Sequence, residues 1–414
     1  LISVDALRAD RLAAYGGDPA LTPALNELAR DSIVFERAYS QEPWTLTSHM
    51  SMLTGLLPDV HGLDMGRPLA PSIWTLPERL RDAGYRTAAS VMGCYWLSPE
   101  FGYGAGFDRY EEDDRLAAAR APAAAEWLLA DARPGFLFLH LYDPHSDFGV
   151  LPYEASAASI ARFAPGATEG FAEWTPAGGA SEALHEVNVG ARDLPDSLRV
   201  ATAALYDAGV HDTDRALAGF FDALRAAGRY DDALILVLAD HGEALGERGL
   251  FLHGDLMEAT LRIPLLVKLP GNARAGTRVE RLIETVDVSP TVLDAAGLPP
   301  EVPNQGRSLL EGAPRAFAHH RSGRDYAITT DDGWRLHYRW TDEGFDARAL
   351  RKILDEATDG PDVLADSLVV VDEWLGPIEE LHRANSRLAD HGRDGAVELD
   401  AADEELLRSL GYIQ

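Results

Sequence analysis

Short runs of apolar residues alternate along this chain with longer stretches in which apolar positions recur at helical spacing. This alternation is typical of an α/β protein in which helices connect the strands of a mostly parallel sheet. The apolar runs predict strands at Leu1–Val4, Tyr85–Val91, Phe136–Tyr142, Ala233–Leu238 and Arg262–Leu269. The amphipathic stretches predict helices that begin at Thr22-Pro23, cover Leu76–Ala83, Ala117–Ala130 and Leu205–Ala227, and extend from Ser289-Pro290 to Gly297.

The pattern changes near Gly312, which divides the chain into two expected parts. Residues 1–312 carry the alternating strands and helices of a main domain. Within them, residues 153–196 are rich in Ala, Gly, Ser and Pro, which indicates a long insertion near the mouth of a site. Residues 313–414 predict a smaller α+β subdomain, with a hairpin around Asp331-Asp332-Gly333 followed by helices to the end.

The chain is strongly acidic, with a formal net charge of −30 over 414 residues. Only two lysines occur, Lys268 and Lys352, so arginine supplies nearly all of the positive charge. Such a surface repels nucleic acid and anionic membranes, and an anionic substrate must therefore be attracted by local cations. We expect no nucleic-acid partner and, because no apolar run is long enough to cross a bilayer, no membrane span.

The single cysteine, Cys94, excludes an intramolecular disulfide and a thiolate metal cluster. The chain begins inside an expected strand and without an initiator Met. We expect that an upstream piece is missing, together with any signal peptide that it contains. The sequence therefore leaves the compartment and the oligomeric state open.

Polar residues directly follow three of the expected strands. Asp5 follows the first, Asp143-Pro144-His145 follows Phe136–Tyr142, and Asp240-His241 follows the strand that ends near Leu238. Because ligands bind at the carboxyl ends of parallel strands, these residues meet in one crevice if the strands are neighbours. Two carboxylates and an imidazole suit Mn, Zn or Ca. Each acidic residue taken alone also has a structural explanation, as a helix cap or turn former.

The segment from Trp44 to Gly55 predicts a helix with a hydroxyl residue, Thr45, at its N-terminus. A threonine hydroxyl is unreactive at its ordinary pKa, and coordination to a metal activates it, while the helix N-terminus stabilises negative charge. We therefore expect Thr45 to be the nucleophile and a metal ligand. Thr47 and Ser48 are rivals for this role, and a plain N-cap threonine is the structural alternative.

Two loop histidines complete the expected site. His145 lies at a strand end, and His253 follows a glycine-rich approach over residues 246–249. Either side chain can bind a non-bridging oxygen of the substrate or protonate the leaving group.

Three other polar residues are weaker candidates. His140 lies within the strand Phe136–Tyr142 and is expected to be a core histidine. Asp207 and His211 are four residues apart on a helix and form a candidate second metal site. Such pairs are common on solvated helix faces, so we expect one metal ion rather than two.

Segments spread over nearly the whole chain match one known family. They are Val4-Asp5-Ala6-Leu7-Arg8-Ala9-Asp10, Thr22-Pro23-Ala24-Leu25, Ser48-His49 through Thr54-Gly55, Asp143-Pro144-His145, Ala239-Asp240-His241-Gly242-Glu243, Arg262-Ile263-Pro264-Leu265, Asp287-Val288-Ser289-Pro290-Thr291 and the ending Leu410-Gly411-Tyr412-Ile413. Together they resemble the sulfatase branch of the alkaline phosphatase superfamily. The resemblance implies an alkaline-phosphatase-like α/β/α sandwich with a large, mostly parallel sheet and a small C-terminal α+β subdomain.

The resemblance also implies functions for the candidate residues. The implied metal ligands are Asp5, Asp240 and His241, the implied nucleophile is Thr45, and the implied substrate contacts are His145 and His253.

The chain differs from typical sulfatases around Thr45. Sulfatases carry a Cys or Ser that is converted to formylglycine within a Cys-x-Pro-Ser-Arg signature, whereas this chain has Thr-Leu-Thr-Ser-His at residues 45–49. Threonine cannot be converted to formylglycine, so the formylglycine hydrate mechanism is excluded. Ala6 follows Asp5 where calcium sulfatases pair two aspartates, and His241 follows Asp240 where they often have Asn. Similar threonine and Asp-His arrangements occur in superfamily members that cleave or transfer phosphoryl groups.

The leading hypothesis is therefore a hydrolase that acts on a small sulfate- or phosphate-type ester with one divalent ion, Mn, Zn or Ca. Thr45 attacks the central atom, and water cleaves the resulting covalent intermediate. An acceptor alcohol in place of water would make the protein a phosphoethanolamine- or glycerophosphate-type transferase. The other alternative is a non-catalytic member that binds an anion or a metal. Retention of a full ligand set favours the enzyme.

Overall fold

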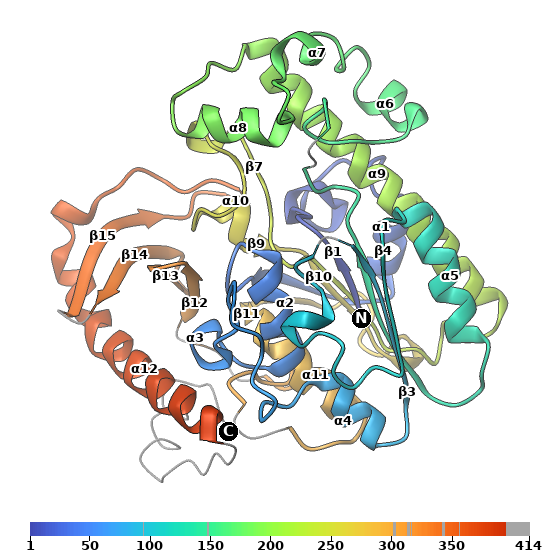
Figure 1. The fold of residues 1–414 in the computed structure, drawn as a ribbon. Helices are drawn as coiled ribbons and strands as arrows, with labels where there is room; N and C mark the ends of the chain where they lie inside the picture. The colour runs from blue at the N-terminus through green and yellow to red at the C-terminus, as the bar shows by residue number, and fades with distance from the viewer. Residues whose placement is uncertain are drawn as a thin grey trace.

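The computed structural model describes residues 1–394 except 94, 147–148, 301–303, 313–314, 316, 342–343 and 356. Cys94 and the C-terminal motif Leu410–Ile413 lie outside the described residues. A large central sheet with helices on both faces forms most of the structure, and a smaller sheet with the long helix α12 lies at its side (Figure 1). The expected α/β/α sandwich with an additional small sheet is confirmed.

The described residues form a nine-stranded central sheet. Its strands, from one edge to the other, are β11 (Arg278–Glu284), β2 (Ile33–Tyr39), β10 (Leu265–Lys268), β6 (Ile235–Leu238), β1 (Ile2–Val4), β5 (Gly135–Leu141), β3 (Arg86–Met92) and β4 (Arg109–Asp113), with β9 (Arg262–Ile263) paired to β2. Strand β10 runs antiparallel to both of its neighbours, and β9 runs antiparallel to β2. The other pairs are parallel, so the sheet is mostly parallel as expected.

Helices cover both faces of this sheet. On one face α1 (Pro23–Arg30) and α5 (Ala117–Leu129) pack against α9 (Asp196–Ala226). On the other face α2 (Thr45–Thr54) and α4 (Leu76–Asp82) contact α11 (Val288–Ala295). Short 3-10 turns occupy Ala9–Arg11, Ala13–Tyr15, Pro99–Phe101, Glu247–Gly249, Pro270–Asn272, Thr285–Asp287 and Leu364–Asp366.

Three strand neighbours position the site. Strand β1 lies between β5 and β6 and runs parallel to both, with Val4 opposite Leu141 and Ser3 opposite Leu238. The three strands therefore end at the same edge of the sheet, and the residues that follow them are adjacent in space. The expected convergence of strand ends is confirmed.

Several element predictions need correction. The expected strand Arg262–Leu269 is two strands, β9 and β10, because Pro264 has no backbone N–H to continue the ladder. Helix α9 begins at Asp196 and not at Leu205, since Leu198 and Ala201 continue its buried stripe. Strands β2, β4 and β11 were not predicted, because charged residues interrupt their apolar pattern.

The smaller sheet is antiparallel, in the order β12 (Phe317–Ser322), β13 (Asp325–Thr330), β14 (Trp334–Thr341) and β15 (Gly344–Lys352), and α12 (Leu368–Asp394) follows it. The hairpin around Asp331-Asp332-Gly333 is confirmed. The expectation of helices directly after that hairpin is wrong, because β15 pairs with β14 before α12 begins. This sheet and α12 share an apolar core with Leu57 and Val60, which lie in and beside α3 (Pro58–His61). The domain boundary near Gly312 stays a prediction.

The expected insertion at residues 153–196 contains α6 (Ala157–Phe163), α7 (Phe171–Trp174) and α8 (Ala180–Asn188), which lie together at the top of Figure 1. Below them, β7 (Ala244–Leu245) and β8 (Phe251–Leu252) form a short hairpin, and α10 (Glu258–Leu261) follows. The amide of Asn188 exchanges two hydrogen bonds of 2.8 Å with the backbone of Phe251. The insertion is therefore attached to the hairpin that leads to His253.

Across the described part of the chain, no helix combines the length and the apolar character that a bilayer crossing requires.

Candidate active site

The loops after β1 and β6 bring Asp5, Asp240 and His241 together, and all three side chains are fully buried. The Nε2 atom of His241 lies 3.6 Å from Oδ1 of Asp5 and 3.4 Å from Oδ2 of Asp240. One ligand atom from each residue lies within 4.8 Å of the other two. The three residues that the sequence singled out as metal ligands thus form one compact group.

The donor atoms of this group fit a divalent cation. Oδ1 of Asp5 and Oδ2 of Asp240 are buried and accept no hydrogen bond. The Nδ1–H of His241 donates to the carbonyl of Gly242 at 2.9 Å, which leaves the lone pair of Nε2 directed at the two carboxylates. Buried carboxylates are costly unless a positive charge or hydrogen bonds compensate them. Two unpartnered carboxylate oxygens and an imidazole nitrogen with a lone pair are suitable ligands for such a cation.

The two carboxylates differ in their electrostatic environment. Burial raises the pKa of Asp5, and repulsion from Asp240 raises it further. Burial also acts to raise the pKa of Asp240, but His241 and His49 outweigh it and hold that pKa well below its usual range. Oδ1 of Asp240 accepts hydrogen bonds from the backbone N–H groups of Ala6 at 3.2 Å and His241 at 2.9 Å. Asp240 is therefore ionised and held in place.

Thr45 is the first residue of α2, and its hydroxyl faces the same group. Its Oγ1 lies 3.4 Å from Oδ2 of Asp5 and 3.4 Å from Nε2 of His241. The N-cap residue is Trp44, so the structural alternative of an N-cap threonine does not apply. The unpaired backbone N–H groups of the first turn of α2 begin beside this hydroxyl, where they favour a negative charge.

The two rival hydroxyls point elsewhere. The hydroxyl of Thr47 is directed at the carbonyl of Trp44 at 3.5 Å. The hydroxyl of Ser48 donates to the backbone carbonyl of Asp240 at 2.7 Å. Ser48 thus attaches α2 to the loop that carries Asp240 and His241. Among the three hydroxyls, only that of Thr45 faces the group of candidate ligands.

His145 and His253 lie beside His241. The ring of His145 stacks on Tyr142 with centroids 4.3 Å apart, and its Nδ1–H donates to the carbonyl of Ser146 at 2.6 Å. Its Nε2 lies 4.0 Å from Oδ1 of Asp5. The ring centroid of His253 is 4.3 Å from that of His241 and 5.0 Å from that of His145.

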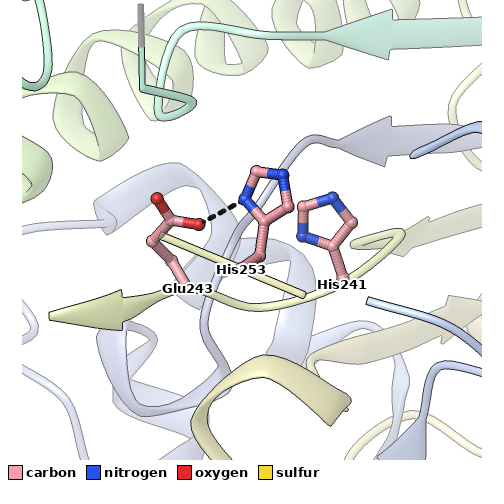
Figure 2. A group of neighbouring side chains, drawn as sticks. All are labelled: His241, Glu243 and His253. Carbon is pink, nitrogen blue, oxygen red and sulfur yellow. Dashed lines mark hydrogen bonds and ion pairs between the residues drawn. The ribbon is translucent and has the colours of Figure 1, made fainter. Parts of the chain in front are cut away.

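A carboxylate orients His253, as Figure 2 shows. Nδ1 of His253 donates to Oε2 of Glu243 at 2.8 Å, which leaves Nε2 as the free ring nitrogen. The hydroxyl of Tyr153, from the expected insertion, donates to Oε1 of Glu243 at 2.6 Å. Burial acts to lower the pKa of His253, but the charge of Glu243 raises it above its usual value. His241, Glu243 and His253 also form a second group whose atoms are close enough to hold a metal ion.

Sequence reasoning did not assign a function to several of these supporting residues. His140, expected as a core histidine, is buried but has its Nε2 3.2 Å from Oδ2 of Asp5. His49 bonds the carbonyl of Thr45 through Nδ1 at 2.9 Å and the hydroxyl of Ser3 through Nε2 at 2.8 Å. Burial lowers the pKa of both histidines to about 4, so both are neutral near pH 7. The sequence signal that could have indicated this contact of His140 is its position as an isolated histidine in an otherwise apolar strand.

The two members of the weaker second-metal candidate, Asp207 and His211, each contact other groups. Asp207 is 2.7 Å from Nε of Arg11 and forms an ion pair with it. Nδ1 of His211 bonds the carbonyl of Leu21 at 2.8 Å, and its ring packs against Phe163. Within the described part of the chain, neither residue belongs to a group of three or more His, Cys, Asp or Glu side chains whose atoms are close enough to share an ion.

Comparison with known proteins places this geometry in a family. The model of the family described as "Sulfatase" matches residues 1–298. "Arylsulfatase K" from Bos taurus is 33% identical over 118 residues, which cover 28% of this chain and 22% of that protein. The "Multifunctional alkaline phosphatase superfamily protein PehA" from Trinickia caryophylli is 37% identical over 116 residues, which cover 27% of this chain and 23% of that protein. The matched segments therefore span less than a quarter of either relative.

Solved structures extend the likeness of the fold to nearly the whole chain. The phosphonate monoester hydrolase of Agrobacterium radiobacter has a TM-score of 0.71 at 20% identity, with 94% of this chain and 95% of that chain covered. The phosphonate monoester hydrolase SpPMH of Silicibacter pomeroyi has a TM-score of 0.69 at 21% identity over similar shares, 94% and 95%. The match of the family model to most of the chain, on a fold shared with these hydrolases, shows that the protein belongs to the sulfatase family.

Proposed function

We propose that this protein is a metal-dependent hydrolase of sulfate-, phosphate- or phosphonate-type esters with Thr45 as its nucleophile. The observation that carries the proposal is the position of the Thr45 hydroxyl, 3.4 Å from Oδ2 of Asp5 and 3.4 Å from Nε2 of His241. In the same group, Oδ1 of Asp5 and Oδ2 of Asp240 are buried and have no hydrogen-bond partner. The relatives named as sulfatases and phosphonate monoester hydrolases support this substrate class. Residues 1–312 would carry the chemistry, with 313–414 as a smaller subdomain beside it.

Asp5, Asp240, His241 and the Thr45 hydroxyl would hold one divalent ion. The imidazole in the donor set favours Mn or Zn over Ca, since Ca prefers oxygen ligands alone. When bound, the ion lowers the pKa of the Thr45 hydroxyl and neutralises charge on the equatorial oxygens of the ester.

The protein residues then perform the remaining steps. The Thr45 oxygen attacks the sulfur or phosphorus atom in line with the leaving group, and the N-terminus of α2 stabilises the negative charge that develops. His145 or His253, each with Nε2 free of protein hydrogen bonds among the described residues, would bind an ester oxygen or donate the proton that the leaving group takes. Water next cleaves the Thr45 ester and regenerates the hydroxyl.

The test is a parallel rate assay of the purified chain on an aryl sulfate, a phosphate monoester, a phosphate diester and a phosphonate monoester. Mn, Zn or Ca is added separately after treatment with a chelator. Metal-dependent hydrolysis of at least one substrate supports the proposal. Turnover that appears only when an acceptor alcohol is added identifies a transferase. Metal binding without turnover in either assay identifies a non-catalytic member.

Metal loading is expected to raise the thermal stability of the protein. In the metal-free protein, the buried carboxylates of Asp5 and Asp240 repel each other. A cation at about one hundred times its dissociation constant stabilises the folded state by about 2.7 kcal/mol. Thermal unfolding with and without each metal measures this gain. Asp240→Asn should remove most of it, whereas Asp207→Asn, which alters an ion pair outside the site, should retain it.

The variant Tyr153→Phe tests whether Tyr153 helps to orient His253 through Glu243. The variant loses the hydrogen bond from the hydroxyl to Glu243, whose carboxylate orients His253. We expect kcat to fall by about tenfold to a hundredfold with little change in KM, the range found for residues that orient a ligand. Tyr230→Phe is the matched control, because Tyr230 is another buried tyrosine that donates to a carboxylate, Asp31 at 3.0 Å, near the start of β6. Equal losses in both variants would contradict this function of Tyr153.

A further inference from the structure

A cavity of about 240 Å³ lies between the small sheet and the loop that follows His253. Ser322, at the end of β12, donates to the carbonyl of Gly254 at 2.6 Å and joins the two walls. The ionisable side chains considered below, all of which line the cavity, are those of Arg248, Asp255, Asp325, His337, Arg348 and Arg351. The cavity is thus built from both parts of the chain and is separate from the metal-ligand group.

Three arginines line this cavity in a protein whose net charge is −30. Within the described residues, Arg248 and Arg351 form no ion pair with a carboxylate, and Nη1 of Arg351 donates to the carbonyl of Gly360 at 3.0 Å. Arg348 pairs with Asp346 at 2.5 Å. Two guanidinium groups therefore keep donors for a ligand.

Two aspartates also line the cavity. The carboxylate of Asp325 is held by Arg339, with distances of 2.5 and 3.2 Å, so its charge is compensated from outside the cavity. Asp255 is exposed, and it is the remaining negative charge among the described lining residues. The balance of unpaired charge in the cavity is positive, which favours an anionic ligand.

His337 adds an unused hydrogen-bonding atom to the cavity wall. Its Nε2 is buried and has no hydrogen-bond partner. Burial lowers the pKa of His337 to about 4, and the charges of Arg335, Arg248 and Arg351 contribute, whereas Asp359 opposes them. A neutral imidazole with an N–H at this nitrogen can donate to an anion. An unpartnered buried polar atom costs stability unless a ligand compensates it.

The cavity begins one residue beyond the candidate substrate contact His253. Gly254 has φ +118°, and no atom lies within 4 Å of the position that a Cβ would occupy, so the cavity is open at this residue. In Figure 1 the sheet β12–β15 accordingly lies beside the β7 and α10 region of the main domain. The cavity wall at Gly254 therefore adjoins the candidate substrate contact His253 along the chain.

We propose that this cavity binds a second anionic group of the substrate, a sulfate, phosphate or carboxylate, through Arg248, Arg351 and His337. The proposal rests on the proposed function, because it assigns the substrate class of that site: esters that carry a further negative charge. The arginines would donate charge-assisted hydrogen bonds to the group, and guanidinium geometry suits planar or tetrahedral oxyanions.

Calorimetric titration of the metal-loaded protein tests the proposal without turnover. The probes are a series of alkane disulfonates of increasing chain length and the matching alkane monosulfonates. We expect that, at one chain length, the disulfonate binds about tenfold more tightly than the matching monosulfonate. A gain of this size corresponds to one or two charge-assisted hydrogen bonds. Arg248→Ala and Arg351→Gln should each remove most of this preference. Gln at position 351 retains an amide donor for the carbonyl of Gly360, which protects the fold.

Arg383→Ala is the matched control, because Arg383 is an exposed arginine on α12 that pairs only with Glu379 among the described residues. It should keep the full preference. Disulfonates that bind no better than monosulfonates at every chain length overturn the proposal, as does a preference that survives both arginine variants. The proposal is also overturned if the arginines bind inorganic sulfate but two sulfonates linked in one molecule bind no more tightly than a monosulfonate.

The two proposals fail separately. If no ester is hydrolysed but disulfonates keep their arginine-dependent preference, the proposed function fails and the anion-binding cavity stands. If monoanionic and dianionic esters are hydrolysed with the same kcat/KM and disulfonates show no preference, the hydrolase stands and the cavity has no part in substrate selection.

Discussion

Thr45→Ala is expected to reduce kcat by about a thousandfold or more, while the fold and metal binding are retained. Loss of the nucleophile removes the step that forms the covalent intermediate, and losses of this order or larger follow deletion of a catalytic hydroxyl. The Thr45 hydroxyl has only 3.4 Å contacts with Asp5 and His241, so its removal costs little stability. The measurement is kcat on the best substrate of the panel, with thermal unfolding in parallel.

Two further variants make this result specific. Thr45→Ser keeps a hydroxyl at the start of α2 and should retain measurable turnover. Thr47→Ala removes the hydroxyl directed at the carbonyl of Trp44 and should retain most of the activity. A Thr45→Ala protein with wild-type kcat, or a larger loss in Thr47→Ala, would show that Thr45 is not the nucleophile.

Arg335→Met is expected to lower the free energy of unfolding by about 3–5 kcal/mol, because it leaves buried carboxylates without their cation. Arg335 lies on β14 and is fully buried. Its guanidinium is 2.7 Å from Oε2 of Glu258 in α10 and 2.9 Å from Oδ1 of Asp359. This ion cluster connects the small sheet to the main domain.

The destabilisation should depend on pH. Burial raises the pKa of Glu258, although Arg335 acts to lower it. Without Arg335 the pKa rises further, so the folded variant binds a proton more tightly than the unfolded chain does. A carboxyl of this kind lowers the free energy of unfolding as pH rises through its folded-state pKa. The difference in stability between Arg335→Met and wild type should therefore be greatest at neutral and alkaline pH and shrink on acidification. Chemical denaturation at several pH values measures it.

Arg339→Met is the control on the same strand. Arg339 pairs with Asp325, and about half of each side chain is exposed, with values of 48% and 50%. An exposed pair of this kind contributes about 0–1 kcal/mol, so the variant should be close to wild type. Equal destabilisation in both variants would show that burial of the Arg335 cluster is not the cause.

Much of the fold followed from local patterns in the sequence. The core strands β1, β3, β5 and β6 are short and mostly apolar, and α1, α4 and α5 repeat apolar positions at helical spacing, so short segments were enough to predict them. Strands with mixed patterns could not be recognised in this way. Strand β2 contains Glu36 and Arg37, and β15 contains alternating charges, because their polar faces contact loops or solvent. Only pairing with neighbouring strands makes these segments strands.

The sequence by itself determined which residues are candidates for the metal ligands and the nucleophile. Asp5, Asp240-His241 and Thr45 stand at the ends of recognisable elements, and the carboxyl ends of parallel strands meet at one edge of a sheet. Their proximity could therefore be predicted without the detailed geometry of the fold.

Only the tertiary structure decided which other residues contact and orient these candidate site residues. His140 reaches Asp5 because the register of β1 and β5 sets Ser3 opposite His140. Tyr153 reaches Glu243 because the insertion packs on the β7–β8 hairpin. These contacts join residues 135 and 90 positions apart, and they depend on strand register and loop packing, which result from the whole set of long-range interactions and leave no local signal in the sequence.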